Sequence, residues 1–249
     1  MGTWSIAPAQ DLSLYTRKEF MSSNGISLPY RLLYPGAPAS GKLPLVLVLH
    51  GGGERGNDNE KQLTHGANLF IDPSNRKNFP AYVLFPQCPG DSYWASATIE
   101  RGTNPFKIEL DYSKPIPKGL EATVELVRHL IKTEKIDKKR IYITGLSMGA
   151  MGTFEAVQRY PKIWAAALPI CGMADVNAYN AKAKKIPFWL FHGDADAVVS
   201  VSGSRDMVAK LKSLGYTVTY TEYPGVNHNS WDHAFKEENY LRWMFSQKR

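Results

Sequence analysis

The chain has 249 residues, of which 43% are hydrophobic and 21% charged, and its formal net charge at pH 7 is +7. This composition is typical of a globular protein and excludes a disordered chain. Its apolar runs are too short to span a membrane and its 30 lysines and arginines are dispersed, so we expect neither a membrane span nor nucleic-acid binding.

The beginning of the chain lacks a basic region followed by an apolar one, and residues 1–15 are interpreted as a lead-in segment. The Met-Gly start with its polar continuation suggests a mature chain whose leader has been removed, so a secreted or periplasmic location is favoured over a cytoplasmic one. The two cysteines, Cys88 and Cys171, are too few for a disulfide framework or a metal site, and they leave the redox compartment open.

The first third of the chain predicts strands. Extended segments at 17–21 and 26–34 are separated by the turn sequence Ser-Ser-Asn-Gly. After a loop at 35–42, the aliphatic run at 45–49 predicts a strand that is buried on both faces of a parallel sheet. A short helix over 63–70 and a strand at 81–85 are expected next.

A long irregular stretch is then expected from residue 87 to 117. A loop of this length is unusual unless it forms part of a site, so Tyr93 and Trp94 are candidate pocket walls. The alternative is a satellite hydrophobic cluster beneath the loop.

The remaining sequence alternates between helix and strand. Helices are expected at 120–131, from 148 onward, at 202–214 and at 231–245, and strands at 141–144, 164–170, 187–191 and 217–223. This alternation predicts one α/β domain over residues 1–249 with a mostly parallel sheet. Residues 171–186 are too few for a large cap domain, so we expect an open pocket.

The most informative stretch is Gly145-Leu146-Ser147-Met148-Gly149, between a predicted buried strand and a predicted helix. A strand that turns abruptly into a helix around a serine needs flanking residues without a β-carbon. The helix directs its free N–H groups and its positive dipole end toward any charge that develops at the serine. This pattern indicates a nucleophile at Ser147.

A glycine-rich loop follows the predicted strand at 45–49, with the sequence His50-Gly-Gly-Gly-Glu-Arg-Gly56. Consecutive glycines let backbone amides approach a ligand closely, as an oxyanion site requires. A flexible glycine loop is the competing interpretation.

A serine nucleophile needs a histidine base, and the base needs an acid. Such groups are expected just after later strands, where the sequence offers Asp196 and His228. The order Ser147, Asp196, His228 is typical of one fold class. Asp194 is the alternative acid, and His233, within the last predicted helix, is a weaker base. His50 and His192 are expected to be buried and hydrogen-bonded.

With these motifs the sequence resembles the α/β-hydrolase superfamily, and within it the esterases related to polyhydroxybutyrate depolymerases, feruloyl esterases and "predicted peptidases". The resemblance covers residues 17–247. It rests on the glycine-rich loop, on Pro86-Gln87-Cys88-Pro89, on the Gly-x-Ser-x-Gly segment, on His192-Gly-x-x-Asp196-x-x-Val199 and on His228-Asn-Ser-Trp231.

The resemblance implies a sheet of about eight mostly parallel strands with helices on both faces, no large cap domain and no cofactor. It implies that Ser147 is the nucleophile, Asp196 the acid and His228 the base. The oxyanion donors would be the amides of Met148 and Gly52, with Gly51 or Gly53 as alternatives to Gly52. The strand order of the family would separate Cys88 from Cys171 by about 14 Å, too far for a disulfide.

The function expected is hydrolysis of carboxylic esters through an acyl-enzyme. A serine peptidase of the same fold is an alternative, and an aspartyl-nucleophile phosphatase using Asp194-x-Asp196 or a non-catalytic binding protein are weaker ones. Trp231 could line the leaving-group side of the pocket or only anchor the last helix. If Trp94 and Trp231 bind substrate, they would suit aryl or sugar-linked esters, such as feruloyl or acetyl groups on plant polysaccharide. The oligomeric state stays open.

Overall fold

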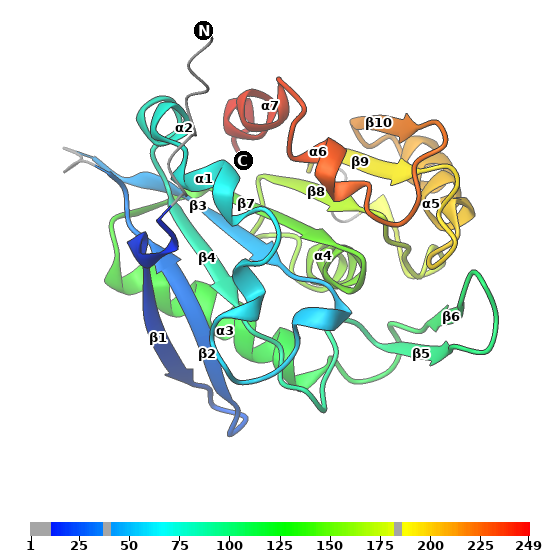
Figure 1. Cartoon of the computed structure of the whole chain (residues 1–249), viewed down its shortest axis with the longest axis horizontal. Helices are drawn as coiled ribbons and strands as arrows, with labels where there is room; N and C mark the ends of the chain where they lie inside the picture. Colours follow the sequence, from blue (N-terminus) through cyan, green and yellow to red (C-terminus); the bar gives the residue numbers. More distant parts are fainter. Residues whose placement is uncertain (1–10, 37–40, 182–185) are drawn as a thin grey trace, which may run out of the picture.

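The computed structural model describes residues 11–36, 41–181 and 186–249. Within these residues an eight-stranded sheet has the order β1-β2-β4-β3-β7-β8-β9-β10 (Figure 1). β2 is antiparallel to β1 and β4, and all neighbours from β4 to β10 are parallel. The strands are β1 (Tyr15–Met21), β2 (Ser27–Leu33), β3 (Leu43–Leu49), β4 (Tyr82–Pro86), β7 (Ile136–Leu146), β8 (Ala166–Ile170), β9 (Phe188–Gly193) and β10 (Val218–Tyr223).

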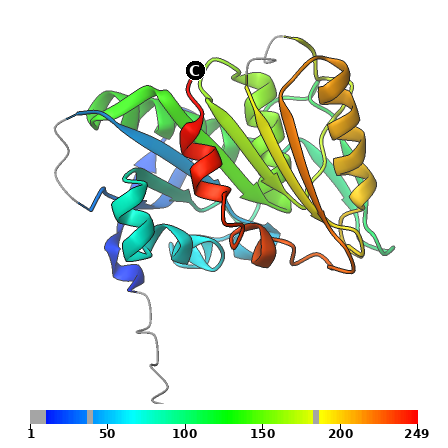
Figure 2. The ribbon, with the colours of Figure 1, turned by 90° about the horizontal axis from the view of Figure 1, so that it is seen from above.

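Helices cover both faces of the sheet (Figure 2). The α-helices are α1 (Ala67–Ile71), α2 (Pro73–Asn78), α3 (Lys118–Thr133), α4 (Met148–Arg159), α5 (Val201–Ser213), α6 (Trp231–Ala234) and α7 (Tyr240–Ser246). Short 3₁₀-helices are η1 (Leu12–Leu14), η2 (Gly52–Glu54) and η3 (Lys61–Leu63). The expected α/β-hydrolase architecture is thus confirmed.

The central strand β3 shows why two helical layers are needed. Its leucines at 45, 47 and 49 belong to the core cluster that includes α3, α4 and α5. Val46 and Val48 point to the other cluster, which includes α1, α6 and α7. Successive side chains of a strand point to opposite faces, so a continuous aliphatic strand is stable only between two covered faces.

The stretch expected to be irregular contains an antiparallel hairpin, made of β5 (Ala97–Glu100) and β6 (Lys107–Leu110). The prediction of an irregular loop is therefore wrong here. Both segments alternate apolar and polar residues, and Ile99 pairs with Ile108 across the hairpin. The hairpin projects from the body of the molecule (Figure 1).

The base of this hairpin is attached to α4 by a buried carboxylate. Glu155 accepts hydrogen bonds from the amide (2.6 Å) and the hydroxyl (2.8 Å) of Ser96, next to the first residue of β5. Arg159, one turn further along α4, pairs with Glu155 at 2.7 Å. A charge that is fully buried requires such partners.

The prediction of a single helix over 231–245 is also wrong, because α6 ends at Ala234 and α7 begins at Tyr240. Between them the Phe235 ring packs 5.6 Å from the Tyr240 ring and lies directly over Gly66, so the chain turns to bury this ring. The helix expected over 63–70 is divided similarly between η3 and α1, and is followed by α2.

Three further expectations concern the N-terminal segment, the two cysteines and a membrane span. Of the lead-in segment 1–15, residues 1–10 lie outside the described residues, and Asp11 caps η1. Cys88 and Cys171 are both buried and free. Among the described helices, none is long and apolar enough to cross a membrane.

Candidate active site

Ser147 occupies a strained turn between β7 and α4. Its backbone has φ 53° and ψ −117°, a conformation that residues with a β-carbon rarely adopt. A Cβ on Gly149 would lie 2.0 Å from the Leu49 carbonyl oxygen, and one on Gly145 would lie 2.4 Å from the Gly149 carbonyl oxygen. Both glycines are thus required by close approach of the backbone, and the turn holds the Ser147 side chain out at the edge of the sheet.

The structure brings Ser147, His228 and Asp196 together. Nε2 of His228 lies 2.9 Å from the Ser147 hydroxyl oxygen, and Nδ1 lies 2.7 Å from Oδ2 of Asp196. The carboxylate can only accept, so Nδ1 carries the hydrogen and Nε2 accepts from the serine. Each residue follows a parallel strand (β7, β10 and β9, respectively), so all three meet at the same edge.

The Asp196 carboxylate is buried and extensively hydrogen-bonded. Its Oδ1 accepts from the amides of Val198 (2.8 Å) and Val199 (2.9 Å). Burial alone would raise the pKa of Asp196, but the hydrogen bonds from His192, His228 and Val199 outweigh it and hold the pKa well below the usual range. The acid is therefore ionised wherever the protein is folded at ordinary pH.

The alternative residues lie elsewhere. Asp194 is exposed and accepts a hydrogen bond from the Gly225 amide (2.6 Å). His233 is exposed and stacks its ring 5.2 Å from the Tyr223 ring. The geometry favours Asp196 and His228 over both.

The glycine-rich loop is fastened at two carbonyl groups. Nδ1 of His50 donates to the Gly51 carbonyl (2.6 Å) because its Nε2 accepts from the Cys88 amide (2.9 Å). Burial lowers the pKa of His50 to about 4, which keeps the ring neutral. Nε of Arg55 donates to the Gly52 carbonyl at 3.0 Å.

A cavity of about 410 Å³ opens beside Ser147 and His228. The residues that line it include the three consecutive glycines, Met151 and Trp231. The Trp231 ring lies edge-to-face on His228 at 5.4 Å and tilted against His65 at 5.0 Å. Trp231 thus borders the pocket, as its predicted role requires.

Trp94 does not line this cavity, so its prediction as a substrate-binding residue is wrong. Its side chain is completely buried in the main core, and its indole N–H donates to the His50 carbonyl (3.1 Å). A large ring whose one polar atom is satisfied internally is stable in the core. The neighbouring Tyr93 does line the cavity.

The wall that sequence reasoning missed comes from the β5–β6 hairpin. Ile99, Phe106 and Ile108 supply apolar surface, and Arg101 lies at the rim. Ala97-Thr-Ile-Glu100 and Lys107-Ile-Glu-Leu110 alternate with period two around a segment that contains Gly102 and Pro105. This hairpin signal could have revealed the wall.

Two other features of the structure, a group of possible metal ligands and a second cavity, are less suited to a function than the site at Ser147. Donor atoms of Cys171, Asp196 and His228 lie within 4.8 Å of one another, a spacing that could hold a metal ion. However, Asp196 and His228 are already hydrogen-bonded, and burial raises the pKa of the Cys171 thiol well above its usual value, which disfavours the thiolate that a metal requires.

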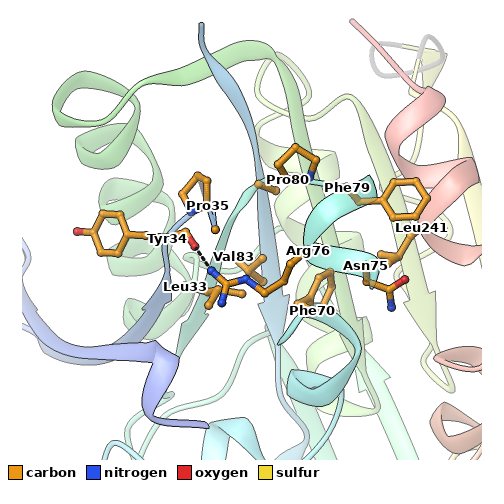
Figure 3. Close-up of a pocket in the computed structure, with 12 residues that line it drawn as sticks. Leu33, Tyr34, Pro35, Phe70, Asn75, Arg76, Phe79, Pro80, Val83 and Leu241 are labelled. Atoms are coloured by element: carbon orange, nitrogen blue, oxygen red, sulfur yellow. Dashed lines mark hydrogen bonds between the residues drawn. The ribbon is translucent and has the colours of Figure 1, made fainter. Parts of the chain in front are cut away.

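A second cavity lies near Arg76, which donates to the Tyr34 carbonyl (3.1 Å; Figure 3). Its volume is about 10 Å³, so it could hold about one water molecule. It shares no lining residue with the cavity beside Ser147.

Comparison with known proteins identifies the family. Residues 102–240 match the phospholipase/carboxylesterase family, and because this is more than half of the chain, the protein belongs to that family of α/β hydrolases. A probable carboxylesterase of Oryza sativa subsp. japonica is 29% identical over 217 residues, which cover 82% of this chain and 77% of the relative.

Solved structures agree in fold. A thermostable esterase has a TM-score of 0.85 and 39% identity over 96% of this chain, which spans 64% of that esterase's length. A ferulic acid esterase from Anaeromyces mucronatus, solved with ferulic acid, has a TM-score of 0.68 and 15% identity over 93% of this chain and 90% of its own. At that identity the likeness concerns the fold alone.

Proposed function

We propose that the protein is a serine carboxylesterase in which Ser147 is the nucleophile, His228 the general base and Asp196 the acid that supports it. Membership of the phospholipase/carboxylesterase family gives the coarse function. The proposed roles rest on one observation, the continuous chain of hydrogen bonds from the Ser147 hydroxyl through His228 to Asp196, at 2.9 and 2.7 Å.

In the proposed reaction His228 accepts the hydroxyl proton as Ser147 attacks the ester carbonyl carbon. The tetrahedral intermediate collapses when His228 returns the proton to the leaving alcohol, which leaves an acyl group on Ser147. Water activated by His228 then releases the acid. Asp196 stays ionised and stabilises the imidazolium that forms in both steps.

The negative charge on the intermediate requires amide donors, for which we propose Met148 and Gly52. Met148 is the first residue of α4, where the amide has no acceptor within its own helix. In a trans peptide the carbonyl and the following N–H point in opposite directions. Because His50 holds the Gly51 carbonyl, the Gly52 amide points away from His50, and Gly52 also lines the cavity.

The substrate that we propose is an aryl or acetyl ester, with feruloyl or acetyl groups of plant polysaccharide as candidates. The apolar residues Ile99, Phe106 and Ile108 line the same cavity as Trp231, and a flat aromatic acyl group would bury well against these side chains. The alcohol part could extend toward the rim at Tyr93 and Arg101, where a second hollow continues outward.

Replacement of Ser147 by alanine tests the chemistry. Ser147→Ala should abolish hydrolysis of nitrophenyl acetate and labelling by a fluorophosphonate, with an unchanged melting temperature. A variant that keeps a substantial fraction of the activity would overturn the proposed nucleophile.

A panel of acetyl, butyryl, octanoyl and feruloyl esters tests the substrate class. We expect acetyl or feruloyl esters to give the highest kcat/KM. Hydrolysis restricted to long acyl chains would overturn the carbohydrate-ester proposal and leave the carboxylesterase chemistry intact.

A further inference from the structure

A second histidine contacts the carboxylate that supports His228. His192, the penultimate residue of β9, is completely buried. Its Nε2 lies 3.2 Å from Oδ2 of Asp196 and 3.0 Å from the Val199 carbonyl oxygen. Its Nδ1 lies 2.7 Å from the hydroxyl oxygen of Ser204, and that oxygen lies 3.0 Å from the Gly172 carbonyl oxygen.

These partners determine where the His192 ring carries its hydrogen. Both neighbours of Nε2 are oxygens that can only accept, so Nε2 must be protonated. The Ser204 hydroxyl has one hydrogen, which goes to Nδ1 when the ring is neutral and to the Gly172 carbonyl when Nδ1 is protonated. The ring therefore gives Asp196 a hydrogen bond in each protonation state that its surroundings allow.

Oδ2 of Asp196 is consequently shared between two imidazoles, His192 from β9 and His228 from the loop after β10. Ser204 lies in the first turn of α5 and also contacts the Gly172 carbonyl after β8, so the His192 ring is anchored through Ser204. Two amides already fix Oδ1. The carboxylate thus cannot rotate without breaking buried hydrogen bonds, each of which would leave a polar group unsatisfied.

We infer that His192 is a positioning residue for ester hydrolysis, which holds the Asp196 carboxylate so that Oδ2 faces Nδ1 of His228. The inference rests on the proposed roles of Ser147, His228 and Asp196. His192 itself lies outside the residues that border the cavity, so it acts on the reaction through Asp196.

Two substitutions separate this role from a structural one. In His192→Asn the amide nitrogen takes approximately the place of Nδ1, so contact with Ser204 is kept and the donor to Asp196 is lost. In His192→Gln the amide nitrogen reaches the place of Nε2, so the donor to Asp196 is kept. His129→Asn, at an exposed histidine of α3, is the matched control.

We expect His192→Asn to lower kcat roughly 10- to 100-fold with little change in KM, because a hydrogen bond to a charged group is lost. The kcat of His192→Gln should stay within about fivefold of that of the unmodified protein, because the donor to Asp196 is kept.

Other ionisable groups near this pair are common to all variants. Burial keeps the Cys171 thiol, after β8, uncharged. Glu222, on β10, is paired with Arg205 at 2.6 Å. Equal losses of kcat in both His192 variants would indicate a structural role and overturn the inference, as would full activity in His192→Asn.

A measurement on the unmodified protein covers the case in which His192→Asn does not fold. With ¹⁵N-labelled histidine, correlation spectra should show His192 protonated on Nε2, with a slowly exchanging hydrogen whose signal disappears in His192→Gln. Protonation on Nδ1 alone would overturn the inference. This readout does not depend on turnover, so it also distinguishes this inference from a failure of the proposed function, which Ser147→Ala tests.

Discussion

Two regions of the molecule that border the same cavity are built in opposite ways. The first, which we call the polar edge, consists of His50, Ser147, Asp196 and His228 just after β3, β7, β9 and β10. Its side chains make buried or partly buried hydrogen bonds of 2.6 to 2.9 Å. The second is the β5–β6 hairpin, whose strands alternate exposed and half-buried residues and whose tip is exposed.

The difference follows from what each region must do. Proton transfer requires groups held at hydrogen-bond distance, and burial with full hydrogen bonding provides such precision. A pocket wall needs only a suitable apolar shape, which Ile99, Phe106 and Ile108 provide. Changes in the polar edge should therefore affect all esters alike, whereas changes in the hairpin should affect some esters more than others.

The largest loss should come from the polar edge itself. Asp196→Asn replaces an acceptor of hydrogen bonds with a group that disfavours the required tautomer of His228. We expect kcat to fall roughly 10³- to 10⁴-fold for every ester tested. Steady-state kinetics on acetyl and aryl esters checks this, and a loss confined to one ester would contradict it.

Acid should lower the free energy of unfolding of the protein through His50, a residue of the polar edge. Burial lowers the pKa of His50 from 6.5 to about 4, so below pH 6.5 the unfolded chain binds a proton that the folded chain does not. The free energy of unfolding should therefore fall by up to about 3 kcal/mol as the pH decreases from 6.5 to 4. His50→Gln should lack this contribution, so its free energy of unfolding should fall less between pH 7 and pH 4 than that of the unmodified protein. Urea unfolding at the two pH values measures both changes, and an equal fall in the two proteins would contradict the prediction.

A smaller and selective effect is expected from the hairpin. Ile99→Ala combined with Ile108→Ala removes apolar surface from the wall. We expect kcat/KM to fall about tenfold for aryl or bulky acyl esters and to change less than about twofold for acetyl esters. Parallel kinetics on the two ester classes measures the ratio, and an unchanged ratio would show that the wall does not select substrates.

The smallest effect should come from Trp231, which lies in neither region but borders the same cavity and contacts His228. Trp231→Ala removes an edge-to-face contact, and kcat/KM should fall roughly three- to tenfold. Trp243→Ala, at a half-buried indole of α7, is the control and should change stability more than activity. A Trp231→Ala variant with unaltered kcat/KM would limit this residue to a role in folding.

The polar edge was largely predictable from the sequence, because its chemistry depends on short motifs after recognisable strands. Ser147 could be located because Gly145 and Gly149 must flank such a turn, and β3 because it is continuously aliphatic. Asp196 was distinguished from Asp194 only by the spacing of the family motif. Parallel strands then bring the motifs to the same edge of the sheet, so distant segments could be assigned to one site.

The wall was not predictable in the same way. A short hairpin has a weak local signal, because each of its strands offers only four alternating residues. Trp94 was wrongly placed because sequence does not reveal whether a loop tryptophan faces a cavity or the core beneath it. The interruption between α6 and α7 depends on the packing of Phe235 over Gly66, a contact between residues far apart in the chain.

The attachment of Ser96 to Glu155 has a consequence for motion in this protein. Ser147 immediately precedes α4, and the hairpin is tied to that same helix two turns further on through a carboxylate shielded from solvent. Thermal displacements of α4 therefore carry nucleophile and wall together. The distance between Ser147 and the hairpin should therefore vary less than the distance from either of them to the parts of the cavity lining that are not tied to α4.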